Sequence, residues 1–242
     1  MSSVSPERRR EIAEGLDAAR SRIAAAEDAA GRPRGSVGLV VVTKTFPAAE
    51  VAVLHDLGVR RVGENRDQEA SAKAAELADR DLVWHFIGQL QTNKAKSVAR
   101  YASVVESVDR PKVVAALSRG ATAAGRELQC LVQVSLEESG DELDGDAARG
   151  GALPDEVPEV AAAIKDAPGL SLGGVMAVAP LGADPGPAFA RLAEVATRLQ
   201  GDHPEASVIS AGMSQDLEAA VQHGATHVRL GSAILGYRPP FG

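Results

Sequence analysis

Short runs of apolar residues alternate along the chain with longer stretches in which apolar residues recur at every third or fourth position. The short runs have the length and β-branched content of buried strands. They cover residues 38–44, 60–65, 82–88, 102–108, 128–136, 170–178, 206–210 and 226–231. The longer stretches have the period of amphipathic helices, most clearly over residues 48–58, 66–78, 110–125 and 188–200. Because strands and helices alternate, the pattern predicts a parallel sheet.

Eight strand–helix units in a chain of 242 residues predict the fold class. They fit an α/β fold of the single (β/α)8 TIM-barrel type, which uses about 250 residues for eight units. An open doubly wound sheet would place a glycine-rich turn after its first strand. The sequence "TKTFPAAE" at residues 43–50 contains no glycine. We therefore expect one barrel domain over residues 1–242.

A further helix is predicted ahead of the first strand, over residues 5–30. Ser5 is of the residue type that caps helices, Pro6 suits the first helical position, and apolar residues follow at helical spacing. The basic run "RRR" at residues 8–10 lies among glutamates and indicates a solvated helix face. Residues 137–156 are rich in glycine and acidic residues and predict a mobile loop after the fifth strand.

Charge and cysteine content exclude several classes of function. The formal net charge of −7 argues against general nucleic-acid binding, which requires clustered Lys and Arg. The single cysteine, Cys130, allows no intrachain disulfide and lies in an apolar run, so we expect a buried structural thiol. No stretch approaches 18 apolar residues, and the first residues lack the apolar core of a signal peptide. We expect a cytoplasmic protein that neither enters a membrane nor binds nucleic acid.

Lys44 is the first candidate for chemistry, because it ends the apolar run "GLVVVTK" and precedes Pro47. In a (β/α)8 barrel the active face lies at the C-terminal ends of the strands. We expect the Lys44 amine to project into an apolar barrel mouth. Desolvation there would lower the pKa of the amine and make it a nucleophile toward aldehydes. The alternative is a lysine that extends to solvent from a strand end.

Glycine and serine follow the last two predicted strands. Ser210, Gly212 and Ser214 stand between the seventh strand and a helix for which Ser214 is the expected N-cap, and Gly231 and Ser232 follow the eighth strand. Glycine lets backbone N–H groups approach an anion, and helix N-termini present unpaired donors. Barrels often bind phosphate with these two loops, so we predict a phosphate site, although ordinary turns also use Gly and Ser.

A reactive lysine on the first strand lies beside the eighth strand once the barrel closes. An aldehyde-reactive amine next to a phosphate site suggests pyridoxal 5′-phosphate (PLP), bound to Lys44 as a Schiff base. Arg229, on the eighth strand, would face the pyridine nitrogen and keep it unprotonated. Such a ring is a poor electron sink, which argues against transaminase-like chemistry.

Several stretches together resemble the pyridoxal-phosphate homeostasis proteins (the YggS/PROSC group), which are related to the barrel domain of alanine racemase. The matching stretches cover nearly the whole chain in order: "VTKTFP", "VGENRDQE", "WHFIGQLQTNK", "ESVDR", "GVMAVAP" and "SAGMSQDLEAAVQHGATHVRLGSAILG". The resemblance implies an alanine-racemase N-terminal-domain-like fold and PLP as cofactor. It implies roles for the following residues: Lys44 (Schiff base), Asn65 (near the cofactor), Ser210, Gly231 and Ser232 (phosphate), Arg229 (pyridine nitrogen), Met213 (pocket wall) and His85 (mouth). We add Ser214, at the predicted phosphate turn.

The resemblance further implies a cofactor carrier in vitamin B6 homeostasis rather than a committed enzyme. Alanine racemase takes a catalytic Tyr from a partner subunit's second domain, and the tyrosines of this chain are Tyr101 and Tyr237. An open pocket could pass PLP to apo-enzymes that use it, with knock-on effects on amino-acid metabolism. Without the racemase dimer domain we expect a monomer. Two alternatives stay open: an amino-acid racemase-like enzyme, and a phosphosugar-binding barrel in which Lys44 contacts an anion.

Overall fold

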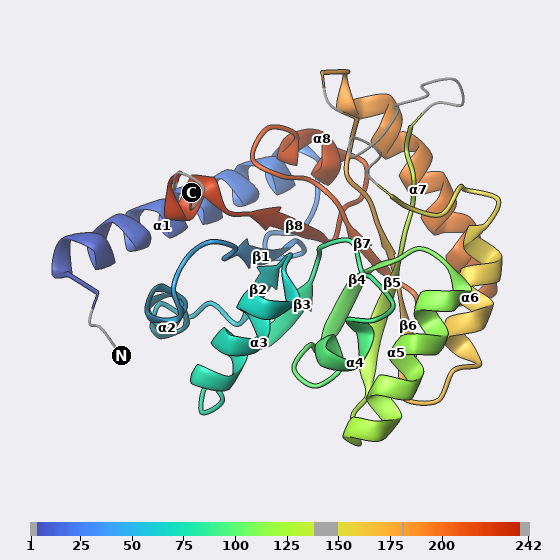
Figure 1. The fold of residues 1–242 in the computed structure, drawn as a ribbon. Helices are drawn as coiled ribbons and strands as arrows, with labels where there is room; N and C mark the ends of the chain where they lie inside the picture. The colour runs from blue at the N-terminus through green and yellow to red at the C-terminus, as the bar shows by residue number, and fades with distance from the viewer. Residues whose placement is uncertain (1–3, 138–149, 181, 238–242) are drawn as a thin grey trace.

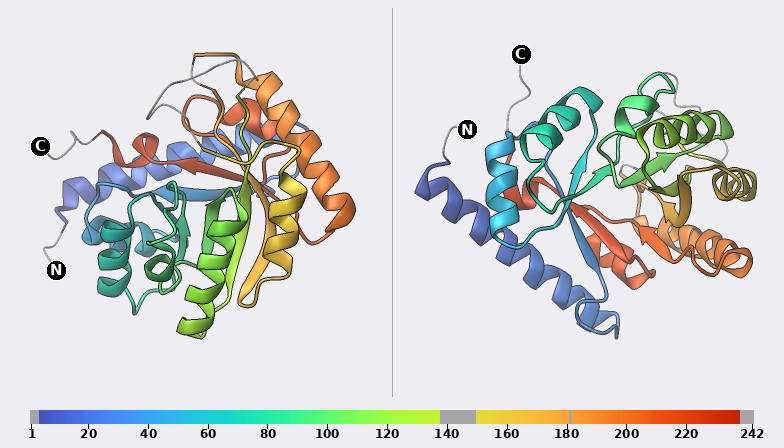
Figure 2. Two further views of the ribbon diagram at one scale, coloured as in Figure 1. Left: turned by 45° about the vertical axis from the view of Figure 1, so that its right-hand side comes forward. Right: turned by 90° about the horizontal axis from the view of Figure 1, so that it is seen from below.

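A closed barrel of eight parallel strands, arranged in chain order, forms the centre of the molecule in the computed structural model (Figures 1 and 2). The structure describes residues 4–137, 150–180 and 182–237. The strands are β1 (Gly38–Val42), β2 (Arg61–Glu64), β3 (Val83–Phe86), β4 (Val104–Val108), β5 (Leu128–Gln133), β6 (Leu170–Met176), β7 (Val208–Ser210) and β8 (His227–Leu230). The barrel closes where β1 pairs with β8, with Gly38 opposite His227. The predicted (β/α)8 barrel is therefore confirmed.

Helices cover the outside of the barrel, as Figure 1 shows. After α1 (Pro6–Ala29) they are α2 (Ala48–Asp56), α3 (Asp67–Glu76), α4 (Ala95–Val98), α5 (Pro111–Ala124), α6 (Val157–Lys165), α7 (Pro185–Asp202), α8 (Leu217–Gln222) and α9 (Ser232–Leu235). The four clearest predicted helices correspond to α2, α3, α5 and α7. Periodicity did not delimit α4, which is a single turn and too short to show a period.

Helix α1 confirms the predicted N-terminal helix. Its N-cap is Ser5, whose hydroxyl accepts a hydrogen bond from the Arg8 N–H, and a proline follows directly. The buried face, which includes Ile12 and Leu16, belongs to the same apolar cluster as residues of α8 and α9. Helix α1 therefore packs along the last two helices of the described chain, as Figure 1 shows.

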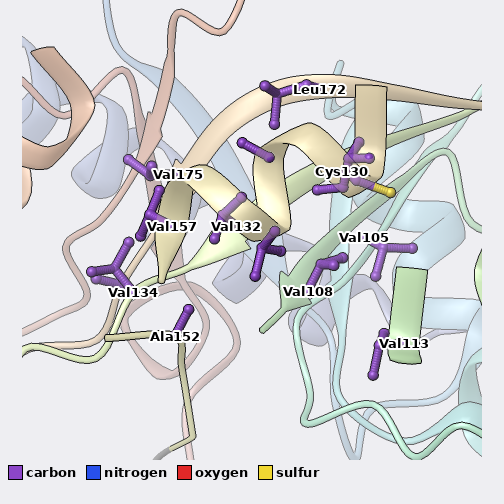
Figure 3. Close-up of a cluster of buried hydrophobic side chains, with 14 of the residues drawn as sticks. Val105, Val108, Val113, Cys130, Val132, Val134, Ala152, Val157, Leu172 and Val175 are labelled. Atoms are coloured by element: carbon purple, nitrogen blue, oxygen red, sulfur yellow. The ribbon is translucent and has the colours of Figure 1, made fainter. Parts of the chain in front are cut away.

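Most of the apolar core lies between the barrel and its covering helices. Figure 3 shows one part of it, in which Cys130 and Val132 of β5 lie among valines and leucines of the neighbouring elements. Cys130 is buried and forms no disulfide, and burial raises the pKa of its thiol to about 12. This confirms the expected structural role, since a thiol with such a pKa is a poor nucleophile.

The predicted 137–156 loop is only partly within the described residues, because residues 138–149 lie outside them. Its last part pairs with the barrel: Ala152 forms a parallel bridge with Val134, and its N–H donates to the Gln133 carbonyl at 2.8 Å. The mobility predicted for residues 137–156 stays a prediction. Within the described residues, none of the helices combines the length and apolar character needed to cross a membrane.

Candidate functional site

A cavity of about 800 Å³ opens at the C-terminal ends of β1, β7 and β8. Its size falls in the range of small-molecule sites, and its position is the barrel face where enzymes of this fold keep their active sites. Six of the nine residues proposed from the sequence line it: Lys44, Met213, Ser214, Arg229, Gly231 and Ser232. Val42, Phe46, Ala179 and Pro180 supply apolar wall, and Tyr237 stands at the cavity as well.

Lys44 lies in the turn that follows β1, which ends two residues earlier than predicted, at Val42. The Lys44 side chain is exposed and lines the cavity at the barrel mouth, so the desolvation expected of its amine stays a prediction. The next residue, Thr45, has φ of 68°. A β-branched residue is strained in that region of backbone space. The turn is held in part by the Thr45 N–H, which donates to Glu69 of α3 at 3.2 Å.

A buried ion pair lies behind this turn. The Lys73 amine of α3 donates to Glu64 Oε1 at 2.7 Å and to the Thr43 carbonyl at 2.8 Å. The Thr43 hydroxyl donates to the same carboxylate oxygen at 2.6 Å. Burial raises the pKa of Glu64, while the charge of Lys73 opposes that shift. Since Thr43 directly precedes Lys44, this pair fixes the backbone from which Lys44 projects.

The two turns predicted to hold phosphate meet at the cavity. Gly212 has φ of 93°, and a Cβ there would lie 2.7 Å from the Ala220 Cβ, so this position requires glycine. A Cβ at Gly231 would lie 3.0 Å from the Val42 carbonyl oxygen, which explains how β8 approaches β1 so closely. The prediction of Ser214 as an N-cap is wrong. Ser214 lies in a turn, and Asp216 is the N-cap of α8.

A network of polar side chains crosses the barrel interior beneath the cavity. His85 Nδ1 lies 2.6 Å from Glu106 Oε1, and the Ser210 hydroxyl donates to Glu106 Oε2 at 2.6 Å. Arg229 donates from Nη1 to the hydroxyl and carbonyl oxygens of Ser210 at 2.7 and 2.8 Å. Its Nη2 donates to the Ala177 carbonyl at 2.8 Å. The network fixes the Arg229 guanidinium at the cavity wall.

Glu106 carries the negative charge of this network. Its side chain is fully buried, which raises the pKa of the carboxyl, but the hydrogen bond from His85 and the charges of His85 and Arg229 outweigh burial. The pKa of Glu106 is therefore lowered to about 2. Burial lowers the pKa of Arg229, and the Glu106 carboxylate opposes that shift. An ionised Glu106 thus compensates the buried Arg229 charge.

Three residues proposed from the sequence lie outside the cavity lining. Ser210 and His85 are buried in the network below, and Asn65 is half-buried after β2. The Ser210 hydroxyl therefore forms hydrogen bonds with Glu106 and Arg229 instead of facing the two turns predicted to hold phosphate. Glu106 is not among the residues proposed from the sequence, although an acid inside the apolar run "SVVESV" is the signal that could have found it.

Comparison with known proteins agrees with this geometry. Residues 15–239 match the family model described as "Alanine racemase, N-terminal domain". A Mycobacterium tuberculosis protein named pyridoxal phosphate homeostasis protein is 46% identical over 98% of this chain and 96% of its own. A structure of an unknown protein from Bifidobacterium adolescentis has a TM-score of 0.86 at 32% identity, covering 97% of this chain and 98% of that chain. The structure of PipY from Synechococcus elongatus, solved with PLP bound, has a TM-score of 0.77 at 34% identity and covers 93% and 100%.

Fold and site therefore define a barrel of the alanine racemase N-terminal domain class. The relatives that match this chain over nearly its full length share one name, and that name narrows the class further. The chain belongs to the pyridoxal phosphate homeostasis protein family.

Proposed function

We propose that this protein binds pyridoxal 5′-phosphate in the cavity and holds it on Lys44 as a Schiff base. The observation that carries the proposal is that one exposed amine, an anchored guanidinium and two glycine–serine turns line the same cavity. The donor set fits the cofactor: Lys44 suits its aldehyde, Ser214, Gly231 and Ser232 suit its phosphate, and Arg229 suits its ring nitrogen. The relatives named for PLP homeostasis and the PLP-bound PipY structure support the same assignment.

Each of these groups would act in binding rather than in turnover. PLP supplies an aldehyde and an electron-withdrawing ring when bound. A guanidinium donates a hydrogen bond and does not protonate the ring nitrogen, since it keeps its own proton far more strongly than a pyridine does. Arg229 would therefore leave the ring nitrogen unprotonated, which keeps the ring a poor electron sink, and would help to orient the ring. The exposed Lys44 leaves the bound aldehyde within reach of solvent and of other proteins.

We infer a role in intracellular vitamin B6 homeostasis and cofactor supply, with effects on amino-acid metabolism that follow from cofactor supply. In this role the chain acts as a monomer that passes PLP to apo-enzymes. The names of its relatives support the homeostasis role. Size-exclusion chromatography with light scattering tests the monomer, with a mass of 25.0 kDa expected.

The decisive experiment is the absorption spectrum of the purified protein with PLP, beside Lys44→Ala. The wild type should turn yellow, and borohydride reduction with peptide mapping should find a pyridoxyl group on Lys44. Lys112→Ala, which removes an exposed lysine of α5 outside the cavity lining, is the matched control and should behave as wild type. A colourless wild type would contradict the proposal and favour a phosphosugar-binding barrel.

One observation favours a second candidate, an amino-acid racemase-like enzyme. Two-base racemisation needs a second acid–base group near Lys44, and Tyr237 lines the same cavity with a side chain that is 90% exposed. Conversion of L- to D-alanine by the PLP-loaded wild type, lost in Tyr237→Phe, would support this enzyme. We expect no conversion above that of Lys44→Ala.

A further inference from the structure

Helix α1 lies outside the barrel, bonds to the first of the two proposed phosphate turns at Ser214, and packs against α9, the helix that follows the second turn. The two helices that follow these turns, α8 and α9, have six and four residues. Isolated helices of that length are not stable in water. Their position, and the position of the turns before them, must therefore be fixed by packing against other elements.

Two arginines of α1 bond directly to the backbone of these segments. Arg22 Nη1 donates to the Ser214 carbonyl at 2.7 Å, and its other nitrogens form a two-point pair with Glu218 of α8 at 2.6 Å each. Arg8 Nη2 donates to the Leu235 carbonyl at the end of α9 at 2.8 Å and to Glu50 of α2 at 2.6 Å. The sequence interpretation of residues 8–10 as a solvated face is therefore wrong for Arg8, which is half-buried.

The geometry of the Arg22 contact has a direct consequence for the cavity. A peptide group is planar, and its C=O and N–H point in opposite directions. Because Arg22 holds the Ser214 carbonyl toward α1, the N–H of Gln215 in the same peptide group points away from α1. Gln215 lines the cavity. A hydrogen bond to the carbonyl also polarises the peptide group, which makes its N–H a stronger donor.

Arg22 and Arg8 lie about four helical turns apart on α1. Between them, α1 touches α9 through its backbone: a Cβ on Gly15 would lie 2.6 Å from the Ile234 carbonyl oxygen. One helix therefore bonds to the turn before α8 and packs against α9, which follows the second turn.

We propose that Arg22 and Arg8 are positioning residues, and that Arg22 sets the preference of the site for a phosphorylated aldehyde. Neither guanidinium belongs to the cavity lining, so both act through the groups that they contact. This inference rests on the proposed function, because it assumes that the two turns receive the phosphate. It adds that recognition of the phosphate depends on Arg22, whereas capture of the aldehyde by Lys44 does not.

The test compares PLP with pyridoxal, which has the same ring and aldehyde but no phosphate. Dissociation constants for both come from absorbance titration of the wild type, Arg22→Ala and Arg8→Ala. Each variant should bind PLP about tenfold more weakly, the size expected for the loss of one charge-assisted hydrogen bond. In Arg22→Ala, pyridoxal binding should change less than about twofold on the same reasoning, since the lost bond reaches only the turn at Ser214. In Arg8→Ala pyridoxal binding should weaken as well, because Arg8 also lies over the ring of Phe46 in the cavity wall.

Controls separate positioning from general stability. Arg34→Ala removes another arginine, which pairs with Asp28 on the surface and lies outside the cavity lining, and it should leave both constants unchanged. Glu218→Ala breaks the surface ion pair but leaves Arg22 able to bond the Ser214 carbonyl. This variant should therefore still bind PLP in preference to pyridoxal. If Arg22→Ala does not fold, Arg22→Lys replaces it. This variant should also weaken the binding of PLP more than the binding of pyridoxal.

The outcomes distinguish this inference from the proposed function. If Arg22→Ala weakens the binding of PLP and of pyridoxal equally, or changes neither, the positioning role is overturned. The proposed function, PLP binding by the wild type, would still stand. A wild type that binds neither aldehyde would instead overturn the proposed function and this inference with it. We expect selective weakening of PLP binding in Arg22→Ala, and weakening of both aldehydes in Arg8→Ala.

Discussion

The backbone directly after Lys44 stores strain at a single residue. Thr45 is the one non-glycine residue with positive φ among residues 4–137, 150–180 and 182–237. Such a conformation costs about 1–3 kcal/mol and is found where the surrounding structure enforces it. Glu69 and the buried Glu64–Lys73 pair provide that enforcement on either side of Lys44. Strain next to the proposed reactive amine indicates that the direction of Lys44 is maintained against the local preference of the chain.

Replacement of Thr45 by glycine tests this strain. Glycine adopts positive φ without penalty but costs about 0.5–1 kcal/mol in backbone entropy, so Thr45→Gly should raise the free energy of unfolding by about 1 kcal/mol. Urea denaturation measures it. The same substitution at Thr197, in the exposed middle of α7, should instead destabilise the protein. A destabilised Thr45→Gly would show that Thr45 is not strained.

Residue identity alone predicted part of the site. Strand ends of a closed barrel meet at one face, and five residues that follow or end strands line one cavity there: Lys44, Ser214, Arg229, Gly231 and Ser232. Their roles in binding stay a prediction. The partners of these residues could not be predicted in this way. Several of them lie at helix positions, such as Lys73 and Arg22, where a charged side chain usually signals nothing more than a solvated face.

At the scale of elements, strand and helix positions were predictable because periodicity is a local property, and strand ends were less so. The predicted strands extend one to three residues beyond the observed ones, since apolar residues continue into the turns that cover the barrel ends. Packing between elements was not predictable. The close contact of α1 with α9 depends on Gly15, which the sequence shows only as a glycine inside a helix.

Alanine substitution at two helical glycines tests that contact. Gly15→Ala should lower the free energy of unfolding by about 1–3 kcal/mol, because the new Cβ meets backbone that cannot move without shifting α9. Gly201, in α7, has nothing within 4 Å of an added Cβ. Gly201→Ala should therefore stabilise the protein by about 0.5–1 kcal/mol through helix propensity. Thermal unfolding compares the two, and equal shifts would contradict close packing of α1 on α9.

At the scale of the whole molecule, the buried charge of Glu106 links stability to pH. Its pKa lies at about 2 in the folded protein, below the ordinary value of 4.5 for a glutamate. A lowered pKa stabilises the fold fully above the ordinary value, and the contribution is lost as pH falls through the folded value. Between about pH 5 and pH 2, Glu106 should therefore lose on the order of 3 kcal/mol of stabilisation.

Glu106→Gln removes this titration while keeping the shape of the side chain. The difference in free energy of unfolding between wild type and variant should be constant from pH 7 to about pH 5 and should shrink below that. Glu159→Gln, at an exposed position of α6, provides the comparison. A difference that does not vary with pH would mean that Glu106 is already protonated in the folded protein.

The packing of α1 against α9 also has a consequence for the order in which the molecule is made. Helix α1 leaves the ribosome first among the described helices, and α9 leaves last. Until then the apolar face of α1 lacks its partners in α8 and α9. Both phosphate turns and the pairing of β1 with β8 arise from that same late segment. A nascent chain therefore carries Lys44 without a cavity around it until α9 has emerged, and the proposed capture of PLP can begin only after that point.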